Sequence, residues 1–198
     1  MRKRIRRGVR VTRYVIYKET LINYKEHFWS FVGAFIGIAG IAFFQSKILT
    51  DFENVFLIGS FGASCVLIYG AIQSPLAQPR NLIGGHLLSA FIGVTSYKLM
   101  PQVLWINAPL AVALSIVCMQ VTKTLHPPGG ATALIAVIGS EKVKALGYLY
   151  ILSPVLSGAL ILLIVALIFN NITPYRHYPS NRQVSAYIRR RFRLSMLH

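Results

Sequence analysis

Long apolar stretches make up most of this chain, and they decide the environment in which it can fold. Each of five stretches has 18 or more residues and contains no Asp or Glu: 28–45, 55–73, 82–100, 103–122 and 148–169. A helix of about 20 apolar residues crosses the hydrocarbon core of a bilayer, which is about 30 Å thick. Only 13% of the residues are charged, whereas a soluble domain has about 25%. We therefore predict an all-α integral membrane protein, a bundle of about five to six transmembrane helices.

Basic residues gather at the two ends of the chain. The net charge is +16, and nine of the Lys and Arg residues precede position 28 while six follow position 170. Cytoplasmic segments of membrane proteins carry an excess of Lys and Arg, so we expect a multi-pass plasma-membrane protein with both termini in the cytoplasm. We divide the chain into a basic N-terminal segment 1–27, a transmembrane domain 28–170 and a basic C-terminal tail 171–198. We expect both ends to contact anionic lipid headgroups and not nucleic acid.

Two termini on one side of the membrane require an even number of crossings, whereas the five long stretches give an odd number. A short apolar segment can resolve this difference. Segment 129–139 has only 11 residues, and a helix of that length rises roughly 17 Å. As a broken helix preceded by extended chain, it completes a sixth crossing and places Arg80 and Lys123 inside and Glu141 outside. In the alternative, 55–73 and the short segment are both re-entrant and four crossings remain. The positive-inside rule favours six crossings, because that topology places Arg80 and Lys123 in the cytoplasm.

Two parts of the chain match each other at a constant offset of 68 residues. Positions 62–67 read Gly-Ala-Ser-Cys-Val-Leu and positions 130–135 read Gly-Ala-Thr-Ala-Leu-Ile, while 88–90 match 156–158. A duplication would produce halves of three segments each: long, broken and long. An odd number of segments inverts one half relative to the other, and inverted halves that meet at broken helices are a recurrent plan of transporters. We therefore predict an inverted three-segment repeat.

The start of the short segment combines two prolines with two glycines and a histidine. Pro127 and Pro128 suit the first turn of a helix, because they have no N–H to leave unpaired. We expect the amides that follow to be free, to converge and to carry the positive end of the helix dipole, which favours an anion. The candidate binding residues here are His126, Pro127, Pro128, Gly129, Gly130, Ala131 and Thr132. The alternative is that Pro and Gly only break the helix and allow close packing.

Five other residues complete the candidate site: Gly62, Ser64, Arg80, Asn81 and His86. The first two are the repeat equivalents of residues in the short segment, and a serine at position 60 precedes them. Arg80, beside Asn81, either supplies a fixed positive charge at the site entrance or only anchors the topology. A protonated His86 or His126 would attract an anion, and a titrating one would couple transport to protons. Either histidine can instead be a hydrogen-bonded packing group.

The absence of acidic residues from the apolar stretches indicates which class of substrate to expect. Carriers of cations commonly keep Asp or Glu in the membrane, and none of the five apolar stretches contains either. The substrate we expect is therefore anionic. The chain has no nucleophile paired with a base and no Gly-rich nucleotide loop, and its cysteines, Cys65 and Cys118, lie far apart within apolar stretches. We expect no enzymatic activity and no cofactor or metal.

Several runs of residues resemble a known family. The run 125–139, Leu-His-Pro-Pro-Gly-Gly-Ala-Thr-Ala-Leu-Ile-Ala-Val-Ile-Gly, is similar to the signature of the HPP family of membrane proteins. Positions 74–81 with 84–86, and 170–171 followed by 178–179, are similar to other recurrent stretches of that family. The resemblance covers roughly residues 28–179. It implies about four spans, which favours the re-entrant alternative, and it implies a bacterial member related to the plastid and cyanobacterial proteins that are linked to nitrite transport.

The leading hypothesis is a membrane transporter or channel for a small inorganic anion, nitrite first. The anion would bind at the N-termini of the broken helices near the middle of the membrane. The alternative is a membrane scaffold or regulatory subunit that transports nothing. The direction of transport, the coupling ion and the choice between carrier and channel are left open, as is assembly into a homo-oligomer.

Overall fold

The structure is a computed structural model that describes residues 24–45, 59–173 and 175–195. These residues form helices joined by short turns and contain no strand, which confirms the predicted all-α class. Most of the basic N-terminal segment, 1–23, lies outside them. In chain order the elements are α2 (Tyr24–Gln45), the helix Gly59–Gly70 ending in η1 (Val66–Gly70), η2 (Pro75–Ala77), α4 (Pro79–Leu99), α5 (Leu104–Val121), α6 (Pro127–Ile138), α7 (Glu141–Ala145), η3 (Ile151–Leu156), α8 (Ser157–Ile172) and α9 (Arg182–Ser195).

Three of the described helices are long and apolar enough to cross a membrane by length and composition. They are α2, α5 and the continuous stretch Ile151–Ile172, which η3 and α8 form together. These helices lie where the sequence predicts the first, fourth and fifth spans. The third predicted span is also a helix, α4, but it carries Arg80 near its start and Lys98 near its end and has many small and polar residues between them. The chain is therefore built as a membrane protein.

The second predicted span is shorter than expected. Within 55–73, the helix of the described residues is Gly59–Gly70, called here the 59–70 helix, and it rises roughly 18 Å. Its end is π-helical, and the backbone leaves helical geometry at Ala71, where φ is −126°. This helix and α6 are each about half the thickness of the hydrocarbon core. The described residues therefore include two half-length helices, at the positions where the predicted repeat has its two broken segments.

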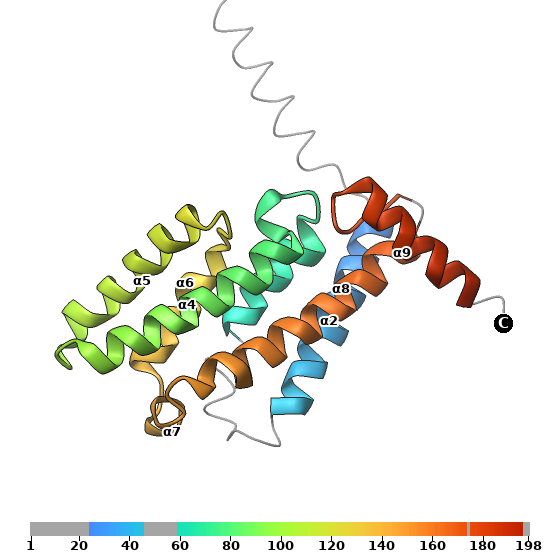
Figure 1. Ribbon diagram of the computed structural model, residues 1–198. Helices are drawn as coiled ribbons and strands as arrows, with labels where there is room; N and C mark the ends of the chain where they lie inside the picture. The colour runs from blue at the N-terminus through green and yellow to red at the C-terminus, as the bar shows by residue number, and fades with distance from the viewer. Residues whose placement is uncertain (1–23, 46–58, 174, 196–198) are drawn as a thin grey trace, which may run out of the picture.

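Hydrogen bonds place several helix ends at one rim of the molecule. Arg176, which follows α8, donates to the Glu26 carboxylate in the first turn of α2 and to the carbonyl oxygen of Tyr69 at the end of the 59–70 helix. Arg80, in the first turn of α4, donates to the carbonyl oxygen of Thr122 at the end of α5. Figure 1 shows the described ends of the chain, α2 and α9, on this same side.

Other contacts define the opposite rim. The ammonium of Lys98, at the end of α4, lies 5.8 Å from the ring centroid of Tyr148, just before η3. Lys144 of α7 lies 5.4 Å from the ring centroid of Tyr97. Each long or half-length helix is therefore antiparallel to the one before it in the chain, as Figure 1 also shows. This alternation is the path that the six-crossing prediction requires, and the side of the membrane that each rim faces stays a prediction.

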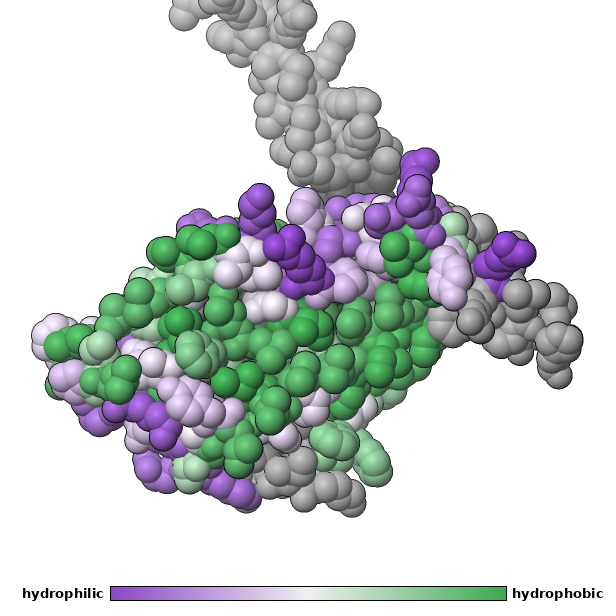
Figure 2. Space-filling model, viewed as in Figure 1, coloured by the Kyte–Doolittle hydropathy of each residue, from purple (hydrophilic) through white to green (hydrophobic). Residues whose placement is uncertain are grey.

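Apolar side chains form a belt between the two rims on the face drawn in Figure 2. Figure 2 shows this belt over α8 and its neighbours, with hydrophilic residues above and below it. Its members are large and exposed: Phe31, Phe35, Phe43, Trp105, Val117, Leu160 and Ile164. A soluble monomer rarely exposes so large a continuous apolar surface. Lipid is the environment that matches it.

Helices α4 and α6 cross closely because glycine lines the crossing. A Cβ added at Gly93 would lie 2.5 Å from the carbonyl oxygen of Ala133, and one added at Gly85 would lie 2.5 Å from Cβ of His126. A Cβ at Gly129 would lie 2.8 Å from the Ser89 hydroxyl. Small residues that let helix backbones approach are the usual basis of helix packing in lipid. This crossing holds the start of α6 against the middle of α4.

We expect Gly129→Ala to destabilise the protein by about 1–3 kcal/mol, because the added methyl group overpacks the crossing. Gly130→Ala is the matched control: its added Cβ meets only Val112 Cγ1, at 3.7 Å, and alanine favours a helix over glycine. Thermal unfolding of both variants in the same detergent compares them. Equal melting temperatures for the two variants would show that the crossing is looser than these contacts indicate.

Candidate functional site

Helix α6 begins at the residue where the sequence predicts a helix start. His126 is the N-cap with extended backbone (φ −140°, ψ 102°), and Pro127 and Pro128 occupy the first helical positions. The chain reaches this start through a turn in which Lys123 has a positive φ of 55°. The prolines force this break, because a proline ring clashes with a preceding helical turn and cannot donate to it.

The free amides expected at this helix start are not all available. The Gly129 amide donates to the carbonyl oxygen of His126 at 2.8 Å, and the two prolines have no N–H to offer. The next amides, from Gly130 onward, lie within α6, where each donates to the carbonyl four residues earlier. The prediction of an open set of backbone donors is therefore wrong for Gly129, because the prolines let helical bonding begin immediately after them.

Side chains, rather than amides, gather at this point. Ser60 and Ser64 of the 59–70 helix, His86 of α4, and His126 and Thr132 of α6 form a connected cluster, here called the histidine cluster, and each is at most 2% exposed. The Ser60 and Thr132 hydroxyl oxygens are 2.8 Å apart, and Thr132 Oγ1 lies 2.7 Å from His86 Nδ1. Ser64 Oγ lies 2.8 Å from His86 Nε2 and 2.9 Å from His126 Nε2.

One backbone carbonyl determines where the protons of this cluster lie. His126 Nδ1 is 2.9 Å from the carbonyl oxygen of Leu76, which can only accept, so Nδ1 carries a proton. In a neutral imidazole Nε2 then accepts, and the hydroxyl of Ser64 donates to it. Since the single hydroxyl proton of Ser64 is used, His86 Nε2 must donate to Ser64 Oγ.

The remaining donors and acceptors of the cluster follow from the proton on His86 Nε2. With its proton on Nε2, a neutral His86 accepts at Nδ1, and the hydroxyl of Thr132 donates to it. Thr132 Oγ1 in turn accepts from the hydroxyl of Ser60. Every hydrogen bond therefore points from Ser60 toward Leu76, and both imidazoles are neutral in this arrangement.

Each hydroxyl also has a backbone carbonyl as a second acceptor. Ser64 Oγ lies 3.3 Å from the carbonyl oxygen of Ser60, and Thr132 Oγ1 lies 3.4 Å from that of Pro128. For Ser60 the alternative acceptor is the same Pro128 carbonyl, at 3.1 Å. If an imidazole takes up a proton, the neighbouring hydroxyl can rotate to its carbonyl and accept from the ring. The cluster can thus accept a proton without moving heavy atoms.

The surroundings of the two imidazoles are uncharged. The rings of His86 and His126 lie 4.9 Å apart between centroids, and the Phe61 ring lies 5.1 Å from that of His86. Tyr150, just before η3, donates to the carbonyl oxygen of Thr132 at 3.1 Å. Among the described residues, the hydrogen bonds of the cluster involve no charged side chain, and no group of three or more His, Cys, Asp or Glu is placed to hold a metal.

The predicted site residues divide into two groups. Ser64, His86, His126 and Thr132 come together in the cluster, whereas Arg80 and Asn81 do not reach it. Their side chains donate to the carbonyl oxygens of Thr122 and Leu125, both at 2.7 Å, and so tie the start of α4 to the turn before α6. Gly62 has open space where a side chain would project and contributes no group to the cluster.

Two partners of the cluster were not predicted from the sequence. The carbonyl of Leu76, which orients His126, lies in a turn, and the hydroxyl of Tyr150 comes from the start of the last span. No sequence signal identifies either, since both contacts join residues distant in the chain. The offset of 68, which brought Ser60 into view in the sequence, pairs it with Pro128, and the Ser60 hydroxyl lies 3.1 Å from the Pro128 carbonyl oxygen. The duplication itself stays a prediction.

Comparisons with known proteins agree with this architecture. Two proteins of Dictyostelium discoideum named as transmembrane proteins are each 47% identical to this chain over 157 residues, which is 76% of the chain. The matches cover 49% and 54% of those relatives, so the chain spans about half of their length. No solved structure gives a significant match. The family model described as the HPP transmembrane region matches residues 19–179, and the chain therefore belongs to the HPP family of membrane proteins.

Proposed function

We propose that this protein is a membrane transporter or channel for a small inorganic anion, with nitrite as the first candidate. The observation that carries the proposal is the histidine cluster: two neutral imidazoles and three hydroxyls, all buried, between the 59–70 helix and α6. Broken helices near the middle of the membrane are where many transporters bind their substrates. The anion is held here by side chains, with the N-terminal dipole of α6 as a further favourable term.

The cluster supports anion binding because its hydroxyl groups can rotate and donate to a bound anion. In the arrangement described above, the hydroxyls of Ser64 and Thr132 donate to imidazole nitrogens. A proton on His126 reverses the bond from Ser64 and frees that hydroxyl, and a proton on His86 does the same for Thr132. With one of the two rings protonated, an entering anion accepts from the freed hydroxyl and lies beside the positive ring.

Charge balance couples the anion to a proton. A proton alone on a buried imidazole, or an anion alone in the same uncharged environment, loses its hydration without a partner. Together they form a neutral pair. We therefore propose that the anion moves with a proton, and that the coupling ion is H⁺.

The test is uptake of nitrite, nitrate, formate and chloride by proteoliposomes that contain the purified protein. We expect nitrite uptake to be the fastest of the four and to rise as the external pH falls from 8 to 6, by up to about tenfold per pH unit for one proton. Protein-free liposomes at each pH correct for nitrous acid that crosses the lipid unaided. Uptake that is flat between pH 5 and 8 would contradict proton coupling, and no uptake of any of the four would contradict transport.

A second candidate function is a membrane scaffold or regulatory subunit without transport or enzymatic activity. The observation in its favour is that each side chain of the cluster already has a hydrogen-bond partner, as in a purely structural polar core. A purified protein that moves no anion but co-purifies with one defined partner supports this candidate.

We further propose an orientation. The rim that contains Arg80 and Arg176 also bears α9, in which the sequence is rich in arginine. The positive-inside rule places this rim in the cytoplasm and both termini with it, in the plasma membrane, where anionic headgroups contact the basic ends. A homo-oligomer is compatible with the proposal and is not needed for the cluster.

A further inference from the structure

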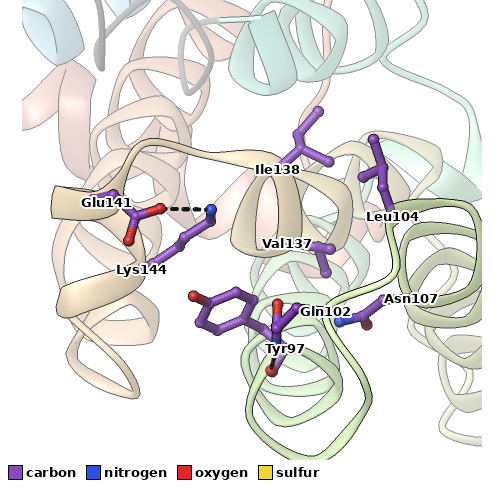
Figure 3. A pocket seen from close by; sticks show the side chains of 8 residues that line it. All are labelled: Tyr97, Gln102, Leu104, Asn107, Val137, Ile138, Glu141 and Lys144. Atoms are coloured by element: carbon purple, nitrogen blue, oxygen red, sulfur yellow. Dashed lines mark hydrogen bonds and ion pairs between the residues drawn. The ribbon is translucent and has the colours of Figure 1, made fainter.

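A second site lies at the opposite end of α6 from the histidine cluster. The ends of α4, α5, α6 and α7 line a partly open cavity of about 420 Å³, which is shown from close by in Figure 3. Its size is within the range of about 300 to 1,000 Å³ typical of sites for small organic ligands. Polar side chains from three of these elements and the loop after α4 line it: Tyr97, Gln102, Asn107, Glu141 and Lys144.

The amide of Asn107 is the strongest indication of a ligand. This side chain is 1% exposed, and its Oδ1 accepts a hydrogen bond from the hydroxyl of Ser96. Its Nδ2 has no hydrogen-bond partner among the described residues. Figure 3 shows the nitrogen turned toward the side of Gln102 and Tyr97. A buried donor without a partner is costly, by about 1–3 kcal/mol, so this position favours a guest that presents an acceptor.

Lys144 adds a positive charge to the same cavity. Its ammonium donates to Glu141 at 2.9 Å, and this hydrogen bond raises the pKa of Lys144, which is therefore charged. The two partners differ in exposure: the Lys144 side chain is 21% exposed and that of Glu141 is 88% exposed. An exposed ion pair contributes little stability, so a guest anion can replace the Glu141 carboxylate at small cost.

The remaining wall of the cavity is apolar. Leu104, Val137 and Ile138 contribute it, and Leu104 and Ile138 are also partly exposed. A bare inorganic ion would leave these side chains against water, which is unfavourable. We propose that the cavity binds an oxyanion attached to an apolar chain, with its oxygens on Asn107 and Lys144 and its chain on the apolar wall. A soluble carboxylate and an anionic lipid of the bilayer both have this chemistry.

Native mass spectrometry of the full chain in nanodiscs tests the proposal. One sample contains phosphatidylcholine with added octanoate, and the other contains phosphatidylcholine with phosphatidylglycerol and no octanoate. We expect one bound octanoate or one retained phosphatidylglycerol per chain, and the arm in which it appears identifies the source. Absence of a bound molecule in both arms overturns the proposal.

Variants locate the binding. Asn107→Asp keeps the acceptor for Ser96 but repels an oxyanion, and Lys144→Gln removes the charge, so we expect each to reduce occupancy at least about tenfold, as loss of a charge-assisted hydrogen bond does. The matched controls are Gln120→Glu, on the exposed side of α5, and Lys142→Gln, on the exposed side of α7. Occupancy that is the same in the site variants as in the controls overturns the assignment to this cavity.

Discussion

Ser64→Ala is expected to reduce nitrite uptake by proteoliposomes at least about tenfold. The Ser64 hydroxyl is hydrogen-bonded to both imidazoles, at 2.8 and 2.9 Å. Its replacement removes one oxygen atom and little volume, so the helices remain packed while the two rings lose their connection. A hydrogen bond to a charged group contributes about 1.5–3 kcal/mol, which corresponds to roughly 10- to 100-fold in affinity. We expect His126→Ala and Thr132→Val to reduce uptake in the same way.

A second buried serine provides the matched control for this experiment. Ser115 is fully buried in α5, and its hydroxyl donates only to the carbonyl oxygen of Ala111 in its own helix. Ser115→Ala therefore tests loss of a buried hydroxyl without loss of the cluster, and we expect normal uptake. Size-exclusion chromatography of both variants shows that each is folded. Normal uptake by folded Ser64→Ala would refute the role of the cluster in transport.

Arg176→Met is expected to lower the stability of the protein by about 3–5 kcal/mol, as loss of one partner from a buried ion pair does. The side chain of Arg176 is completely buried at the rim, with 0% of its surface accessible. Its guanidinium donates to the Glu26 carboxylate at 3.0 Å, the Ser30 hydroxyl at 3.3 Å, the Tyr69 carbonyl at 2.7 Å and the Asn170 side chain at 2.8 Å. These acceptors belong to α2, the 59–70 helix and α8, so one side chain joins three helices.

Thermal unfolding in detergent measures this effect. For a chain of this size, a loss of about 3 kcal/mol lowers the melting temperature by about 6 to 12 °C. Arg176→Lys should also be destabilised, because an ammonium cannot replace the planar guanidinium at several acceptors. Arg182→Met, at an exposed position in α9, is the control and should melt like the wild type. A melting temperature of Arg176→Met close to that of the control would mean that these contacts do not stabilise the bundle.

The structural role of Arg176 is not visible in its local sequence. From the sequence it was one of six basic residues after the last span and indicated only orientation. In the structure it is the largest fully buried side chain among the described residues. Burial of an arginine depends on acceptors that lie far away in the chain, here up to 150 residues apart, and no local pattern reveals them.

The half-length helices show a similar division. Pro127 and Pro128 identified the start of α6 correctly, because the effect of proline on a helix is local. The 59–70 helix has no proline at its start, and its apolar sequence continues on both sides, so hydropathy predicted a full span there. Only the offset of 68 and the re-entrant alternative indicated a broken segment. Hydropathy measures whether a segment tolerates lipid and not where its helix begins or ends.

The sequence by itself determined that this chain is a helical membrane protein, where most of its long helices lie and where α6 begins. These properties follow from composition, apolar length and the chemistry of proline, all of which act between residues close in the chain. Only the tertiary structure decided that Ser60, Ser64, His86, His126 and Thr132 bond to one another, and that Asn107 faces a cavity. The physical reason is that a hydrogen bond depends on distances of about 3 Å between atoms, and the packing of helices distant in sequence sets those distances.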